Sequence, residues 1–281
     1  MANINTTMHT PLEASSPFAL RVDLGKDVPD TDVRSALATG DMGFLHSFTT
    51  GATVDGPGVR VVAWTTGCMW RCLYCHNPDT WTMTNGMPVT VTRAAEELRK
   101  YRHGLKVMSG GLTVSGGEPL MQHRFVVKVF EAAKMMGVHT ALDTNGFYGA
   151  RLSDADLDVI DLVLLDIKAW DPERHRLLTG QDVGPTLAFA RRLAARRRPV
   201  WLRYVLVPGL TDELGEIEQI ANYAAGLGNV ERVDVLPFHQ MGRYKWHQLG
   251  IPYTLENVEP PDNELVERAC AVFRAAGLQA L

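Results

Sequence analysis

The chain has 281 residues, of which 46% are hydrophobic and 21% charged, the composition of a soluble globular protein with a sizeable core. Its net charge of -4 argues against a general nucleic-acid binder. No apolar run approaches the roughly 18 residues of a membrane span, and the N-terminus lacks the basic and apolar regions of a signal peptide, so we expect a cytoplasmic protein without membrane contact.

The first 43 residues show neither a helical nor a strand period, because Thr, Ser, Asp, Pro and Gly interrupt every short apolar run. We therefore expect residues 1–43 to form an N-terminal extension that is flexible or loosely docked. Residues 44–281 are expected to form one domain.

Beyond the extension, short β-branched runs alternate with amphipathic helical segments, which is typical of a parallel sheet covered by helices. The predicted strands are Arg60–Thr66, Leu112–Ser115, Thr140–Asp143, Leu162–Asp166, Val200–Val207 and Arg232–Leu236. The predicted helices are Thr92–Arg102, Phe125–Met136, Asp154–Ile160, Thr186–Arg198, Glu213–Leu227 and Asn263–Ala276. Six strand–helix units are too few for a closed eight-stranded barrel. The predicted fold is therefore α/β, a partial (β/α)6 TIM-like barrel that is open on one side.

The first predicted strand leads into a loop that carries three cysteines, Cys68, Cys72 and Cys75. Three thiolates this close in sequence converge readily on one metal centre. A structural zinc takes four protein ligands, however, and a four-iron cluster is normally held by four cysteines. The fourth cysteine, Cys270, lies in a predicted helix, where packing is its expected role. The spacing therefore favours an iron–sulfur cluster with one iron open to a small molecule.

Two other interpretations of the cysteine loop stay open at this point. His76 follows Cys75 directly and would complete a zinc site of three cysteines and one histidine if it turned back onto the same metal. The third interpretation is a set of buried thiols without any ligand role.

Polar motifs follow the predicted strands at their carboxyl ends, where the chemistry of such folds is found. They are, in chain order, the cysteine loop, Ser115-Gly-Gly-Glu118, Asp143-Thr-Asn-Gly146, Asp166-Ile-Lys168, Arg203 within the fifth strand and His239 after the sixth. Each motif alone is weak evidence, since Gly-Gly and Asn-Gly are ordinary turn sequences. Their shared position at one rim of the sheet predicts a single site around the metal.

The spacing Cys68-x3-Cys72-x2-Cys75 resembles the signature of the radical S-adenosylmethionine (SAM) family. Within that family, the chain resembles the pyruvate formate-lyase activating enzymes from about His46 to near the C-terminus. The motifs that carry this resemblance are Thr53-Val-Asp-Gly-Pro-Gly58, Cys72-Leu-Tyr-Cys-His-Asn77, Ser115-Gly-Gly-Glu118, Leu142-Asp-Thr-Asn-Gly146, Asp166-Ile-Lys168, Arg203-Tyr-Val205 and Leu236-Pro-Phe-His239. The cysteine motif alone indicates only the superfamily, whereas the ordered set is specific.

This resemblance implies an oxidoreductase of anaerobic metabolism that holds a 4Fe-4S cluster on the three cysteines, with SAM chelating the fourth iron. The reduced cluster would cleave SAM, and the 5'-deoxyadenosyl radical would take a hydrogen atom from a glycine α-carbon of pyruvate formate-lyase. The difficult chemistry belongs to the cofactors, while the protein supplies position, potential tuning and exclusion of water.

The same resemblance implies roles for individual residues. Cofactor contacts are expected from Tyr74, Cys75, His76, Gly116, Gly117, Glu118, Asp166, Ile167, Lys168 and His239. A monovalent cation would bind to Asp143, Thr144 and Asp166. Catalytic roles are expected for the three cysteines and for Lys168, Asp55 and Arg203.

The target enzyme's glycine-bearing loop would be received by Thr53, Val54 and Asp55, with Arg203 pairing to Asp55 or to that loop. Without the family context, Asp55-Gly-Pro-Gly58 is a plain turn signature and Lys168 a solvated lysine at a strand end.

Reduced flavodoxin or a similar electron donor is also implied, and we expect a monomer. The basic run Arg191, Arg192, Arg196, Arg197 and Arg198 would suit docking of such an acidic carrier, although a solvated helix face is the simpler interpretation.

Two alternative functions remain: the same chemistry on another glycyl radical enzyme or an anaerobic ribonucleotide reductase, and a zinc-binding module without redox chemistry. The four cysteines leave none for a ferredoxin-like insert, which favours pyruvate formate-lyase as the target.

Overall fold

Six parallel strands form the centre of the protein in a computed structural model that describes residues 19–20 and 33–281. They are β3 (Arg60–Thr65), β5 (Gly111–Gly116), β6 (His139–Thr144), β7 (Leu162–Asp166), β8 (Val200–Leu206) and β9 (Val230–Pro237). Each lies beside the next in sequence, in the order β3-β5-β6-β7-β8-β9. All six strands predicted from the β-branched runs are confirmed, with shifts of at most two residues at their ends.

Side-chain alternation explains why these segments are strands. Along β8 the residues alternate between buried and half-buried, so that Leu202 and Tyr204 pack outward under helices while Trp201 and Arg203 point to the inner face. The strands in the middle of the sheet are almost continuously buried, as expected for parallel strands covered on the outside and filled on the inside.

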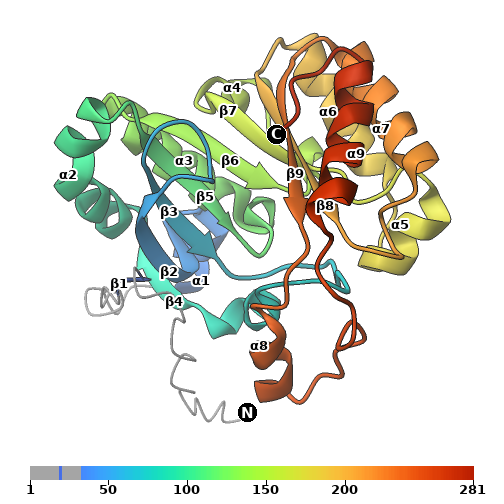
Figure 1. Cartoon of the computed structure of the whole chain (residues 1–281). Helices are drawn as coiled ribbons and strands as arrows, with labels where there is room; N and C mark the ends of the chain where they lie inside the picture. The colour runs from blue at the N-terminus through green and yellow to red at the C-terminus, as the bar shows by residue number, and fades with distance from the viewer. Residues whose placement is uncertain (1–18, 21–32) are drawn as a thin grey trace.

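Helices cover the outer face of the sheet (Figure 1). They are α2 (Val91–Val107), α3 (His123–Met135), α4 (Asp154–Asp158), α6 (Gly184–Ala195), α7 (Leu214–Leu227) and α9 (Asn263–Ala275). Local sequence explains several starts: Thr90, Ser153 and Asp262 each accept a hydrogen bond from a backbone amide of the first turn. The six predicted helices are confirmed, and α1 (Val33–Thr39), α5 (Pro172–Thr179) and α8 (Arg243–Gln248) are additional.

Three strands that the sequence did not predict extend the sheet on one side. The long strand β2 (Met42–Ala52) runs antiparallel to β3, and it also pairs with β4 (Met87–Thr90) and with the two-residue β1 (Ala19–Leu20). The prediction missed β2 because its polar residues and Gly51 interrupt the apolar pattern.

The sheet does not close into a barrel. At the other end, β9 pairs with β8 and forms one isolated bridge, Val233 with Ala280, and within the described residues no strand pairing joins it to β1–β4. The structure is therefore an α/β fold with an open, mostly parallel sheet, which confirms the predicted partial barrel.

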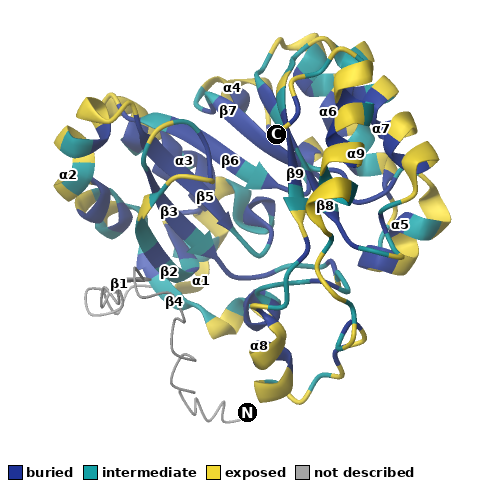
Figure 2. Cartoon of the chain, in the orientation of Figure 1, coloured by how far each residue is buried: buried dark blue, intermediate teal, exposed yellow. Residues whose placement is uncertain are grey.

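Three large apolar clusters among the described residues hold these layers together, a small fourth cluster lies around Leu164, and the burial pattern is visible in Figure 2. The largest lies between β3–β7 and helices α2, α3 and α6, and the second joins β8 and β9 to α7 and α9. The third lies apart from the covering helices and contains Tyr74, Phe238, Trp246 and Tyr253. This third cluster packs α8 against the cysteine loop.

Part of the predicted N-terminal extension belongs to the folded unit. Residues Val33–Thr39 form helix α1, and Met42 at the start of β2 is buried. The side chain of Lys128 in α3 lies 2.6 Å from Asp41, and Arg124 donates to the carbonyl of Ala38. Ordered structure thus begins before residue 44, and the rest of the predicted extension lies outside the described residues, apart from β1.

None of the helices in the described part of the chain is long and apolar enough to cross a membrane.

Candidate functional site

The carboxyl ends of β3, β5, β6, β7 and β8 surround a cavity of about 260 Å³. Its walls include the following residues predicted from the sequence: Asp55, Cys68, Cys72, Tyr74, Cys75, His76, Gly116, Gly117, Asp143, Thr144, Asp166, Lys168 and Arg203. Segments more than a hundred residues apart in the chain therefore meet at one site, as the shared strand-end position of the motifs predicted.

The cysteine loop is held in place by main-chain hydrogen bonds at both of its ends. The amides of Gly67 and Cys68 donate to the carbonyls of Thr80 and Trp81, so the loop closes on itself directly after β3. Within the loop, the amide of Cys75 donates to the carbonyl of Cys72 at 3.1 Å. The loop thus places its three cysteines on one side of the cavity.

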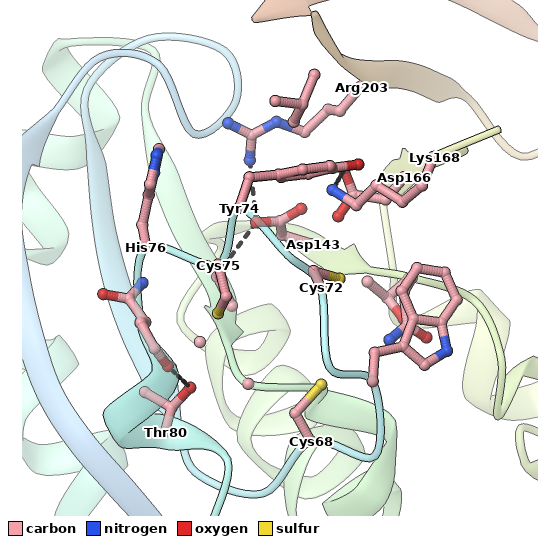
Figure 3. Close-up of a pocket in the computed structure, with 18 of the residues that line it drawn as sticks. Cys68, Cys72, Tyr74, Cys75, His76, Thr80, Asp143, Asp166, Lys168 and Arg203 are labelled. Carbon is pink, nitrogen blue, oxygen red and sulfur yellow. Dashed lines mark hydrogen bonds and ion pairs between the residues drawn. The ribbon is translucent and has the colours of Figure 1, made fainter. Parts of the chain in front are cut away.

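Figure 3 shows the sulfur atoms of Cys68, Cys72 and Cys75 around the same hollow. All three cysteines are free of disulfides and half-buried. Burial raises the pKa of each thiol, to about 12 for Cys72. Buried thiols of this kind become thiolates when a positively charged metal centre binds to them. The donor set therefore fits a metal–sulfur cluster with three cysteine ligands.

The side chain of His76 is directed away from these thiols. Its ring stacks on that of His239, with centroids 3.9 Å apart, and its Nε2 lies 3.2 Å from the carbonyl oxygen of His239. Burial, followed by the neighbouring His239, lowers the pKa of His76 to about 4, so the ring is neutral. His76 therefore does not complete a tetrahedral zinc site, and within the described residues no group of three or more His, Cys, Asp or Glu side chains converges on a single ion.

The glycines of Ser115-Gly-Gly-Glu118 allow the turn after β5 to lie against the cysteine loop. Gly116 has a φ of +117°, and a Cβ there would lie 2.3 Å from the Thr65 carbonyl oxygen. A Cβ on Gly117 would lie 2.4 Å from the carbonyl oxygen of Gly67. The absence of side chains is thus required by protein packing around the cavity.

Lys168 and Asp166 project together into the cavity from the end of β7, as Figure 3 shows. The Lys168 ammonium lies 2.8 Å from Asp166 and 5.7 Å from the centre of the Tyr74 ring. Burial alone would lower the pKa of Lys168, but the Asp166 carboxylate raises it above its ordinary value. Lys168 is therefore a buried, charged donor, which excludes the solvated strand-end alternative.

Arg203 lies between two carboxylates. It donates to Asp143 at 3.0 Å and lies 3.8 Å from Asp55. Asp143 also accepts a 2.6 Å hydrogen bond from Ser115. Burial raises the pKa of Asp55 to about 6, against the opposing effect of the Arg203 charge. The sequence placed Arg203 beside Asp55 or the target loop, and the structure adds Asp143 as its nearer partner.

Asp55 is held at the cavity through its own backbone. Its carbonyl accepts a 2.6 Å hydrogen bond from Thr113. Thr113 in turn accepts from the buried guanidinium of Arg60, whose other donors reach the carbonyls of Pro57 and Leu112. The neighbouring Val54 side chain is 67% exposed, so the segment 53–55 offers a buried carboxyl beside an accessible apolar side chain.

Two residues predicted to bind the cofactor, Ile167 and Glu118, do not line the cavity, and their role in cofactor binding stays a prediction. Ile167 packs in the cluster under α7, because it alternates with the inward-facing Asp166 and Lys168. Glu118 is fully buried and accepts hydrogen bonds from the Thr144 hydroxyl at 2.7 Å and from the amides of two residues, Leu120 and Asn145, at 2.9 Å. Its carboxylate therefore joins the loops after β5 and β6 and does not line the cavity.

The three residues predicted to bind a cation are adjacent but already have partners within the protein. Asp143 pairs with Arg203 and Asp166 with Lys168. The Thr144 hydroxyl donates to Glu118. The cation site stays a prediction.

The basic run at the end of α6 and just beyond it lies away from the cavity, and three of its five arginines form ion pairs. Arg192, Arg196 and Arg198 form ion pairs with Asp154 and Asp158 of α4. These partners neutralise much of the run, which favours the helix-face interpretation over a docking patch.

Sequence reasoning missed the contribution of α8. Lys245 and Trp246 contact the cysteine loop from below, through hydrogen bonds to Asn77 and to the carbonyl of Cys75. It also missed Trp70, Asn77 and Trp81 in the cavity wall. Trp70 lies inside the cysteine motif and Trp81 shortly after it, and this position could have indicated that they line the cavity. Nothing local in the sequence indicated that α8 contacts the cysteine loop.

Comparison with known proteins supports the chemistry suggested by this geometry. Residues 62–224 match the family model of the radical SAM superfamily. A pyruvate formate-lyase-activating enzyme of Staphylococcus epidermidis is 44% identical over 235 residues, which cover 81% of this chain and 93% of the relative. The pyruvate formate-lyase 1-activating enzyme of Escherichia coli K12 is 42% identical over 238 residues, covering 84% and 97%.

Solved structures support the fold. The Streptococcus suis protein SuiB bound to S-adenosylmethionine matches 81% of this chain and 50% of its own with a TM-score of 0.59 at 13% identity. Spore photoproduct lyase matches 79% of this chain and 75% of its own with a TM-score of 0.56, also at 13% identity. At these identities the similarity concerns the open sheet and its helices.

Proposed function

Because the chain belongs to the radical SAM superfamily and, within it, to the family of the pyruvate formate-lyase-activating enzymes, we propose that it activates pyruvate formate-lyase by installing a glycyl radical. The observation that carries this proposal is the convergence of Cys68, Cys72 and Cys75 on a cavity that Lys168 and Arg203 also line. When bound, a 4Fe-4S cluster and SAM supply one-electron cleavage of a carbon–sulfur bond and with it the means of removing a hydrogen atom from a glycine.

The three cysteines would hold the cluster and leave one iron without a protein ligand. The loop that carries them is closed by the Gly67–Thr80 and Cys68–Trp81 hydrogen bonds, so the thiols are positioned before the cluster binds. They are half-buried, which limits the access of water to the site and strengthens electrostatic interactions there.

The remaining cavity residues suit the two ends of SAM. Lys168 is a buried cation for the methionine carboxylate. The amide of Gly117 is already used by the carbonyl of Thr65, so the turn offers carbonyl oxygens to the methionine amino group. The neutral, stacked His76 and His239 and the buried Tyr74 provide flat surfaces for adenine.

The target loop would enter over segment 53–55. Exposed Val54 offers an apolar contact, while Asp55 and Arg203 offer a carboxyl and a guanidinium to a peptide backbone. Both polar groups are held by protein partners, Asp55 through Thr113 and Arg203 through Asp143, which positions them at the cavity.

We further propose a monovalent cation bound near Asp143, Thr144 and Asp166, an acidic one-electron donor such as reduced flavodoxin, a monomeric state and a cytoplasmic location. Two carboxylates facing the same cavity support the cation, because hard oxygen donors suit such ions.

The test is an anaerobic reconstitution with iron and sulfide, followed by reduction with dithionite and addition of SAM and a pyruvate formate-lyase. A glycyl doublet in the electron paramagnetic resonance (EPR) spectrum, together with 5'-deoxyadenosine, is the expected result. A pyruvate formate-lyase whose target glycine is replaced by alanine is the control and should give no doublet. SAM cleavage without the doublet would redirect the proposal to another glycyl radical enzyme, and a chain that takes up no cluster would overturn it.

A further inference from the structure

Helix α8 is fastened to the cysteine loop by several independent contacts. The indole Nε1 of Trp246 donates to the carbonyl of Cys75 at 2.8 Å, and its ring packs edge-on against Trp81 with centroids 5.1 Å apart. Just before the helix, Gly242 lies so close to the loop that a Cβ there would be 2.7 Å from the Cα of His76. In Figure 1, α8 lies below the sheet, apart from the helices that cover its outer face.

A buried ion pair lies at the centre of this contact. The ammonium of Lys245, a residue only 8% exposed, lies 3.0 Å from Asp79 and donates to the side-chain oxygen of Asn77 at 2.8 Å. Asp79 is only 3% exposed. Asn77 and Asp79 follow Cys75 by two and four residues. Lys245 therefore fixes the position of the segment that comes directly after the last of the three cysteines.

A third residue completes the network from β2. The Nε2 of His46 lies 3.0 Å from Asp79, and the pairing of β2 with β3 shifts register between Leu45 and Ser47, on either side of His46. Such a bulge redirects a side chain, here toward Asp79. Burial alone would raise the pKa of Asp79, but the His46 hydrogen bond and the Lys245 charge lower it below its ordinary value, so the carboxylate is ionised.

We propose that Lys245 and Asp79 are positioning residues that hold the cysteine loop from below and set the fixed charge beside the cluster, so that α8 tunes the cluster's reduction potential. This inference rests on the cluster-binding part of the proposed function and is independent of the identity of the target. Reduction adds one negative charge to the cluster, and net charge near an iron–sulfur cluster is one of the factors that set its potential. Both charges lie buried against the segment that follows Cys75, so water screens them little.

The two members of the pair should therefore act in opposite directions. Replacing Lys245 by Met removes a positive charge and keeps an unbranched side chain of similar length, so the potential should become more negative. Replacing Asp79 by Asn removes a negative charge at constant shape, so the potential should become more positive. The double variant K245M/D79N should return close to the wild-type potential, because the net charge is restored.

The experiment is a redox titration of the reconstituted protein followed by EPR, without SAM and again with SAM, combined with iron content and thermal unfolding for each variant. The pair of Lys128 in α3 and Asp41 just before β2, 2.6 Å apart and outside the cavity, supplies matched controls in K128M and D41N. These controls should leave the potential unchanged.

Shifts of opposite sign in the single variants, with recovery in the double variant, would support the proposal. Unchanged potentials, or shifts of the same sign, would overturn it even if both variants were less stable, because a purely structural role lowers stability without reversing the sign. If K245M took up no cluster, the proposal would require two results: a more positive reduction potential in D79N and regained cluster uptake in the double variant. The absence of either result would reject the proposal. A wild-type chain that took up no cluster would instead refute the proposed function.

Discussion

The guanidinium of Arg203 donates a 3.0 Å hydrogen bond to the carboxylate of Asp143, across two strands that are separated in the sheet by β7. Both side chains are nearly buried, at 13% and 12% exposure. The pair spans the inner face of the open sheet at the level of the cavity. Arg203 also lies 3.8 Å from Asp55. The Arg203–Asp143 pair therefore connects the end of β6 to the segment 53–55, which is proposed to receive the target loop.

Breaking this pair should destabilise the fold strongly. Replacing Arg203 by Met leaves the buried Asp143 carboxylate with only the Ser115 hydroxyl, so we expect a loss of about 3 kcal/mol in the free energy of unfolding. The double variant R203M/D143N should recover most of that loss, because no uncompensated charge remains. Urea denaturation of the cluster-free protein at neutral pH measures the free energy of unfolding of each variant. If the loss in the double variant equalled the sum of the losses in the two single variants, the two side chains would act independently.

The raised pKa of Asp55 predicts a pH-dependent difference in stability between the wild type and a variant without this carboxyl. Its pKa is raised to about 6 from 3.8, so the folded state binds this proton more tightly than the unfolded state. Stability is therefore lost as the pH rises from about 4 to about 6, and the cost is complete above that window, at about 2–3 kcal/mol. The variant D55N avoids this cost. Its advantage over wild type should be small near pH 4 and reach its full size by pH 7, while a gap that does not change with pH would contradict the assignment.

We expect three of the cysteines to be cluster ligands and the fourth to contribute only to packing. Replacing Cys68, Cys72 or Cys75 by Ala removes one of three ligands, so each variant should lose most of its cluster iron after reconstitution and all measurable SAM cleavage. Cys270, buried in α9 within a different apolar cluster, is the matched control. C270A should bind iron as wild type does, and a loss of iron there equal to that of the other three would contradict the ligand assignment.

Lys168 should contribute mainly to SAM binding. K168M removes a buried ammonium while keeping the stem, and loss of a charged hydrogen bond is expected to weaken SAM binding by about 10- to 100-fold. Anaerobic calorimetry on the cluster-containing protein measures this affinity directly. The exposed Lys106 in α2 provides the control variant K106M, which should bind SAM as wild type does. Unchanged affinity in K168M would assign the residue to folding alone.

Local sequence determined the elements that depend on neighbours in the chain. The β-branched runs predicted all six parallel strands, because a strand buried on both faces needs nearly continuous apolar residues. The cysteine loop was equally clear, since three ligands within eight residues reach one centre without help from distant segments. The ordered motifs at the strand ends then indicated one cavity, and the structure brings them together there.

Tertiary structure decided which way side chains point and which distant partners they meet. Ile167 was assigned to the cofactor but packs under α7, because strand alternation turns it outward. Glu118 accepts from Thr144 and Asn145, Arg203 meets Asp143, and Lys245 meets Asp79, a residue 166 positions away in the chain. Sequence spacing limits contacts only within one element or loop; contacts between elements depend on how the whole sheet and its helices pack, and that packing placed α8 beneath the cysteines.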